Sequence, residues 1–168
     1  MQGRNQTLEQ WLRRLPEGIF YKHPYAVYWL GVCRHRIDPD EGRDFFEKAF
    51  SLFEEQGDTA GICFSLCGIL DSITFALDSF KSLDRWIPKL AWLSREYEAL
   101  PSAEVRGKLS ATALFSLTFR HPDHPEFKTW EKRGQAILQK NIPVEIKLRV
   151  IVTLAWHRLF SGNLAEAG

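Results

Sequence analysis

The stretch from residue 38 to residue 58, DPDEGRDFFEKAFSLFEEQGD, carries the signals for one complete helix and for the start of the next. Asp38 is suited to cap the first helix, and Pro39 suits the first helical position because the N–H that proline lacks would have no partner there. Gly57 can adopt the left-handed conformation that ends a helix, and Asp58 can cap a second one. The connection between the two helices is therefore very short, which predicts an antiparallel helical hairpin.

The apolar residues of this stretch recur at the spacing of one helical face, while its charged residues fall elsewhere on the helix. The apolar face consists of Phe45, Phe46, Ala49, Phe50 and Phe53. We expect it to be buried against the helices that come before and after. Similar patterns predict helices at about 7–15, 24–36, 59–77, 84–98, 102–120, 125–140 and 143–160. No alternating strand pattern of useful length is present, so the fold class is predicted to be all-α.

The predicted helices form pairs that recur at intervals of roughly forty residues, the period of an α-solenoid built from helix pairs. Residues 1–168 are therefore expected to form a single helical-repeat domain. Its repeats would span about 20–57, 58–100 and 101–141, with an incomplete repeat at 142–168. Each pair would bury its apolar stripe against its neighbours. The two most apolar helices, 59–77 and 143–160, would form the inner layer.

Details of the repeats resemble the tetratricopeptide family. The WLG at 29–31 resembles the signature of the family's first repeat helix, and Gly42, Phe46 and Ala49 match the pattern of its second. GNLAEA at 162–167 looks like the turn and opening of another second helix. The first repeat is about one residue short, and the later repeats are longer than the family's and lose most signature positions.

Long, divergent repeats of this kind are similar to those of large bacterial transcriptional regulators of the maltose-activator type. The resemblance covers about residues 20–168. It implies a right-handed superhelical stack of antiparallel helix pairs that serves as a non-catalytic sensor or scaffold. The expected partner is a protein or peptide, with a small effector as a second possibility, in a signalling or transcription regulator.

Composition limits the other classes of function and the cellular location. A formal charge of +1 provides no bulk attraction to nucleic acid or to an anionic membrane, so we expect neither as a partner. Cys33, Cys63 and Cys67 contain no CxxC pair, and the N-terminus lacks an apolar signal segment, so a cytoplasmic protein with reduced thiols is expected. The 59–77 stretch approaches the length of a membrane span but carries Asp71 at its middle, which favours a buried core helix.

The loop RHPDHP at 120–125 is the best candidate for chemistry. His121, Asp123 and His124 offer two imidazoles and a carboxylate within four residues, so a metal-dependent enzyme is the alternative hypothesis. A metal site needs a third or fourth ligand at a suitable distance, and none is evident nearby. The sequence contains no nucleophile elbow, no P-loop and no dinucleotide-binding glycine motif. We therefore favour a non-enzyme without a cofactor, in which this loop is an inter-helix turn and Asp123 caps the following helix.

Other candidate binding residues lie on the predicted helices. An unpaired carboxylate at Asp71 inside an apolar helix would cost several kcal/mol. Either Asp71 reaches solvent or pairs with an arginine such as Arg34 or Arg36, or it lines a groove and binds a ligand amine or peptide. Trp86 and Trp156 are the further candidates for such a binding surface.

The last residues, AEAG, would stop one turn into a helix that begins at Leu164. Because solenoids need a polar capping element at each end, we expect the chain to be a fragment of a longer protein. The far side of the 143–160 helix would then lack its cover. Exposed apolar patches recruit partners, so self-association through the C-terminal helices is expected, with Trp156 and Phe160 as the main contacts.

Overall fold

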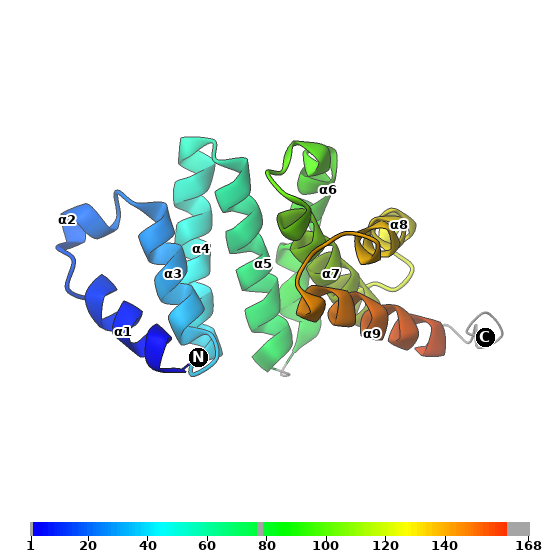
Figure 1. Cartoon of the computed structure of the whole chain (residues 1–168), viewed down its shortest axis with the longest axis horizontal. Coiled ribbons are helices and arrows are strands. Elements are labelled where there is room, and N and C mark those ends of the chain that lie inside the picture. The colour runs from blue at the N-terminus through cyan, green and yellow to red at the C-terminus, as the bar shows by residue number, and fades with distance from the viewer. Residues whose placement is uncertain (1, 77–78, 161–168) are drawn as a thin grey trace. The chain divides into compact units, whose positions relative to one another are not determined.

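A computed structural model of the chain describes residues 2–76 and 79–160. Over these residues the structure is helical and contains no strand, which confirms the all-α prediction. The chain forms two compact units, Met1–Ser79 and Phe80–Gly168 (Figure 1). The helix expected from Leu164 lies outside the described residues, and the grouping of the whole chain into one repeat domain stays a prediction.

Five helices make up the first unit. They are α1 (Gln2–Leu12), α2 (Glu17–Phe20), α3 (Pro24–Arg34), α4 (Pro39–Gln56) and α5 (Thr59–Ala76). The helices α3, α4 and α5 lie side by side and alternate in direction (Figure 1). The short helix α2 was not predicted from the sequence.

The ends of α4 follow the sequence prediction closely. The Asp38 carboxylate accepts a hydrogen bond from the N–H of Glu41 at 3.0 Å, and Gly57 adopts the left-handed conformation with φ of 68°. The carboxylate of Asp58 accepts a hydrogen bond from the N–H of Gly61 at 2.9 Å, at the beginning of α5. The predicted helical hairpin with a very short connection is thus confirmed.

The apolar face of α4 forms the core of the first unit, as predicted. Phe46, Ala49, Phe50 and Phe53 are all at most 3% exposed. Phe46 lies between α3 and α5. A Cβ atom added to Gly31 of α3 or to Gly68 of α5 would lie 2.8 Å or 2.7 Å from its ring. The aromatic rings of α4 therefore occupy the space that glycines leave on both neighbouring helices.

Helix α5 is long enough and apolar enough to cross a membrane by length and composition alone, yet 67% of it is buried inside the structure. The buried positions occur all around the helix and include Cys63 and Cys67, both with free thiols. The burial agrees with the prediction of a core helix at 59–77.

The second unit is built around α7. Its elements are the 3₁₀ helix η1 (Phe80–Arg85), α6 (Ile87–Arg95), the 3₁₀ helix η2 (Tyr97–Ala99), α7 (Ala103–Arg120), α8 (Phe127–Leu138) and α9 (Val144–Phe160). Helix α7 packs against η1, α6, α8 and α9. The helix predicted at 84–98 is shorter in the structure and is flanked by the two 3₁₀ segments, and Pro88 lies in its first turn.

The place of the 143–160 helix in an inner layer stays a prediction, and most of this helix is exposed. Only Val150, Thr153 and Leu154 of α9 are buried. The apolar residues of this helix are distributed around most of its circumference, and the described part of the unit covers one side of it. The other side is exposed and apolar.

We expect Phe50→Ala to lower the free energy of unfolding by about 3–5 kcal/mol, because it removes a ring from a closely packed core. Phe75→Ala is the matched control, since Phe75 is 57% exposed, and its effect should stay below about 1 kcal/mol. Urea melts of both variants provide the measurement. Equal effects of the two substitutions would show that the α4 stripe is not the core.

We expect Gly42→Ala to destabilise the protein by about 1–3 kcal/mol, although alanine is the better helix former. A Cβ atom at Gly42 would lie 2.4 Å from the Cα atom of His35, and backbone cannot move aside as a side chain can. Gly18→Ala is the control, because no atom lies within 4 Å of the added Cβ atom there. Thermal melts should show no loss of stability for Gly18→Ala.

Candidate functional site

Arg34, a predicted binding residue, belongs to an ionic cluster that joins α1, α3 and α4. Arg13 donates hydrogen bonds to Glu9 at 2.8 Å and to Glu41 at 2.9 Å. Arg34 pairs with Glu9 at 3.6 Å and donates a short hydrogen bond to Glu41. Burial alone would raise the pKa of the Glu41 carboxyl, but the hydrogen bonds from both arginines lower it below its usual range. Arg34 therefore has a structural role in holding α1.

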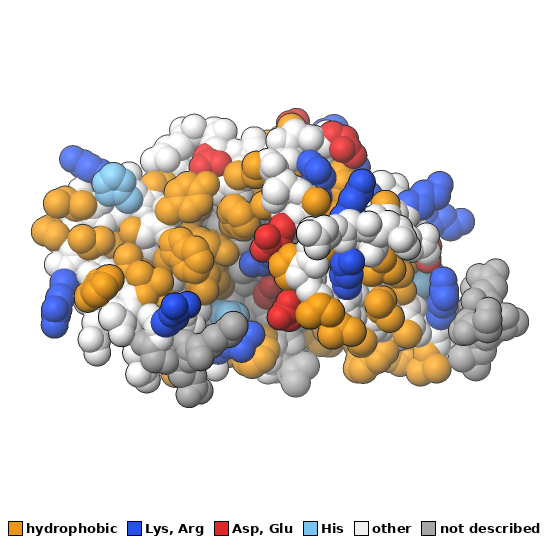
Figure 2. Space-filling model, viewed as in Figure 1, with side chains coloured by type: hydrophobic (Ala, Val, Ile, Leu, Met, Phe, Trp, Pro, Cys, Tyr) orange, Lys and Arg blue, Asp and Glu red, His pale blue; other side chains and the backbone are white. Residues whose placement is uncertain are grey.

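Aromatic side chains gather on a face of the first unit made by α3 and α5. Tyr25 and Trp29 of α3, four residues apart, are 41% and 47% exposed. On α5, Phe64 and Asp71 are half-buried and Phe75 is exposed, at positions that share one side of the helix. Figure 2 shows hydrophobic side chains over these two helices. We call this surface the α3/α5 face.

Internal contacts hold the side chains of the α3/α5 face in place. The buried ring of Tyr28 contacts both Trp29 and Phe64, with ring centroids 5.6 Å and 5.8 Å apart. The Tyr25 hydroxyl donates a hydrogen bond to Asp58 at 2.9 Å. Burial, followed by the hydrogen bond to the Asp58 carboxylate, raises the pKa of Tyr25 to about 12. This face thus presents fixed aromatic rings, with the half-buried Asp71 beside them.

The histidines of the RHPDHP loop have structural partners within the second unit. His121 and Arg120 both bind the carboxylate of Asp84 in η1, with 2.8 Å between His121 Nε2 and Asp84 Oδ1 and 2.7 Å between Arg120 Nε and the same oxygen. The hydrogen bond from Arg120 holds the pKa of Asp84 well below its usual range. His124 accepts a hydrogen bond through Nδ1 from the N–H of Glu126 at 3.2 Å. The loop is therefore pinned at both ends.

The prediction that Asp123 caps the following helix is wrong. Helix α8 begins at Phe127 after Glu126, with no side-chain hydrogen bond at that cap, and it is His124 that binds the Glu126 N–H. Asp123 lies before Pro125 and the first residue of α8, Phe127, and its side chain is exposed. In the described parts of the chain, no group of three His, Cys, Asp or Glu side chains is arranged to hold a metal ion.

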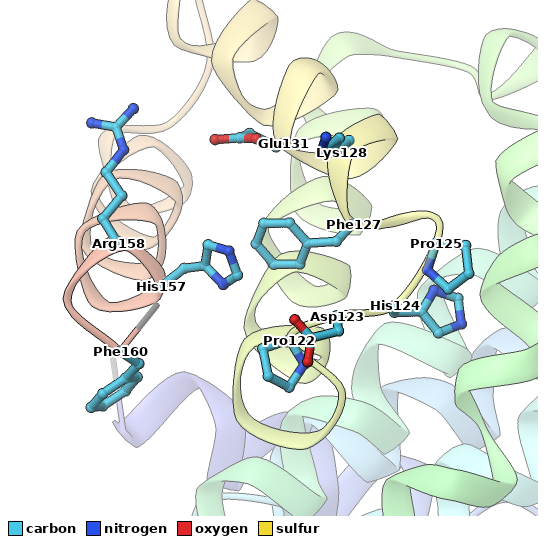
Figure 3. Close-up of a pocket in the computed structure, with 10 residues that line it drawn as sticks. All are labelled: Pro122, Asp123, His124, Pro125, Phe127, Lys128, Glu131, His157, Arg158 and Phe160. Atoms are coloured by element: carbon cyan, nitrogen blue, oxygen red, sulfur yellow. The ribbon is translucent and has the colours of Figure 1, made fainter. Parts of the chain in front are cut away.

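A hollow of about 770 Å³ lies between the loop, α8 and α9 (Figure 3). His157 of α9 stacks on Phe127 of α8, with ring centroids 3.8 Å apart and planes at 22°. The Nδ1 atom of His157 is buried without a hydrogen-bond partner. Burial lowers the pKa of His157, while the carboxylates of Glu131 and Asp123 oppose part of that effect. His157 thus joins α8 to α9 as a neutral ring.

The two tryptophans predicted to bind a ligand have different surroundings. Trp86 is only 6% exposed and lies at the start of α6, so it is part of the core, and a role in binding stays a prediction. Trp156 is 46% exposed and its ring contacts Phe119 of α7 and Phe160, at 5.3 Å and 6.0 Å. Of these two tryptophans, Trp156 is therefore the exposed one.

Sequence reasoning missed the residues that organise these surfaces. Asp84, which anchors the loop, lies more than thirty residues before its partners and carries no local signal. The four-residue spacing of Tyr25 and Trp29 was the one available indication of the α3/α5 face. His157 was visible only as an isolated helical histidine.

The stability of the protein should fall between pH 7 and about pH 5 in part because of His157. Its pKa is lowered in the folded state, so the unfolded chain binds the proton first as the pH drops. His157→Phe keeps an aromatic ring on Phe127 and removes the titration, and its stability should fall less over this range. Urea melts at both pH values measure the effect. An imidazole pKa at or above about 6.5 by NMR would contradict it.

Comparison of the chain with family models, with curated proteins and with solved structures finds no match. The resemblance to tetratricopeptide-type regulators therefore stays a prediction from the sequence motifs.

Proposed function

We propose that the chain is a non-catalytic helical-repeat module that binds a peptide segment of a protein partner. The observation that supports this proposal best is the α3/α5 face, where Tyr25, Trp29 and Phe75 are 41–57% exposed. Fixed aromatic side chains provide large contact areas at low entropic cost, and tryptophan and tyrosine dominate binding hot spots. Two adjacent helices with an aromatic stripe each suit an extended or helical peptide with apolar side chains.

The repeat signatures support a proposal for the whole architecture and for the type of protein in which the module acts. WLG at 29–31 and Gly42, Phe46 and Ala49 resemble parts of the tetratricopeptide pattern, and the ring of Phe46 packs against Gly31 and Gly68. These features support a right-handed stack of helix pairs as the proposed architecture. In this proposal the module acts in the cytoplasm, within a bacterial signalling or transcription regulator, by binding another protein.

The metal-dependent alternative has weaker support. His121 is engaged with Asp84, His124 is engaged with the Glu126 backbone, and Asp123 is exposed. The three side chains that could have bound a metal thus have different surroundings. The polar groups of the loop serve to hold the chain between α7 and α8.

Selection from a library of random twelve-residue peptides, displayed on phage, tests the proposal. Trp29→Ala should weaken binding of the selected peptide roughly tenfold or more, as expected for an aromatic hot spot. Trp11→Ala is the matched control, because Trp11 is 64% exposed on α1 of the same unit, and it should leave binding unchanged. Fluorescence anisotropy with a labelled synthetic peptide measures both affinities.

Two outcomes would count against the proposal. Either no peptide is enriched on the wild-type protein, or the enriched peptides bind Trp29→Ala as tightly as wild type. Circular dichroism of each variant shows whether the fold is intact, so that lost binding is not lost structure.

A further inference from the structure

The exposed side of α9 is the longest apolar strip on a single described helix. Its side chains are 46–63% exposed and comprise Val144, Leu148, Ile151, Val152, Trp156, Leu159 and Phe160. Figure 2 shows hydrophobic side chains along α9. Seven such side chains, each about half exposed, present on the order of 700 Å² of apolar surface, near the ~800 Å² that each partner contributes to a stable interface.

Helical geometry orders these residues across the strip. At 100° per residue, Leu148, Ala155 and Leu159 lie along its middle, opposite the buried Val150 and Leu154. Trp156 and Phe160 lie toward one edge, where their rings contact Phe119 of α7 at 5.3 Å and 6.2 Å. These two aromatics are thus partly covered within the unit, so the open centre of the strip is aliphatic.

The centre of the strip is complementary to itself. We propose that a second copy of this chain covers it, with the two α9 helices packed antiparallel about a twofold axis near Ile151 and Val152. In this register Leu148 faces the small Ala155 of the second copy, and Ala155 faces Leu148 of the second copy. Val144 faces Leu159 at each end. Ridges formed by large side chains then enter the gaps left by small ones.

The antiparallel direction is preferred over the parallel one for two physical reasons. Antiparallel helices oppose their macrodipoles, whereas parallel helices align them. In a parallel pair Leu148 would face Leu148 and Ala155 would face Ala155, so large residues would meet large ones and leave a gap elsewhere. Twofold symmetric dimers are also the commonest closed assemblies. This proposal involves only the second unit and does not rest on the peptide-binding proposal.

Sedimentation velocity over a concentration series tests the dimer. Wild-type protein should form a dimer that dissociates on dilution, and Leu148→Glu should weaken dimerisation at least tenfold because it places a charge at the centre of the interface. Trp11→Glu is the matched control, since it puts the same charge on an exposed aromatic of the first unit, and it should leave dimerisation unchanged. Unaltered circular dichroism and thermal melts confirm that Leu148→Glu folds, because Leu148 is 53% exposed.

Cysteine cross-linking tests the register, and the native thiols do not interfere because Cys33, Cys63 and Cys67 are buried. Val152→Cys, near the twofold axis, should form a disulfide-linked dimer under mild oxidation. Val144→Cys should not link to itself, but it should link to Leu159→Cys when the two variants are mixed. Self-linking of Val144→Cys would indicate a parallel pair and overturn the proposed register. A wild-type chain that stays monomeric at high concentration would overturn the proposal and assign the strip to a different protein.

Discussion

The packing of the phenylalanines of α4 against glycines of its neighbours is the contact on which the first unit depends. The ring of Phe46 fits between Gly31 and Gly68, and the ring of Phe53 lies where a Cβ atom of Gly61 would be only 2.1 Å away. Without side chains at these glycines, three helices approach closely around one line of aromatic rings. The phenylalanines and the glycines therefore depend on one another. A smaller residue in place of a phenylalanine would leave a cavity, and a larger residue in place of a glycine would clash with a ring.

The second unit also packs on a glycine, since a Cβ atom added to Gly134 of α8 would lie 2.7 Å from Leu114 of α7, and it adds a set of polar contacts. Arg133 of α8 donates hydrogen bonds to the side chain and carbonyl of Ser94, each at 2.8 Å, and its guanidinium lies over the rings of Tyr97 and Trp130. The Tyr97 hydroxyl is hydrogen-bonded to Ser110 of α7 at 3.0 Å. These contacts connect α6, α7 and α8 across irregular segments. His121, which resembles a catalytic group in the sequence, likewise makes a structural contact, with Asp84.

Local signals in the sequence predicted most of the helices, but they could not predict contacts between residues that are distant in the sequence. The Asp38 cap, the left-handed Gly57 and the four-residue recurrence of phenylalanines each act within a turn or two, so they were readable before the fold was known. The pairing of Asp84 with Arg120 depends on how η1 meets the end of α7, and no neighbouring residue encodes it. The side of α9 that is covered is a similar case. Its hydropathy shows that it can be buried, but only the surrounding helices decide which side is covered.

The ionic cluster of Glu9, Arg13, Arg34 and Glu41 has a consequence for the N-terminal helix. None of the described side chains of α1 is fully buried: Leu8 and Leu12 are half-buried, and Glu9, which is 16% exposed, pairs with Arg13 and with Arg34 of α3. Partly exposed charge pairs therefore contribute to the attachment of this helix. Surface charge pairs contribute little and are screened by salt. We expect the opening free energy of α1 to fall as ionic strength rises, because salt screens these pairs, and we expect its amides to exchange with solvent before those of the buried helix α4. Salt concentration would then decide how often the α1 side of α3 is uncovered, while the core of the unit stays folded.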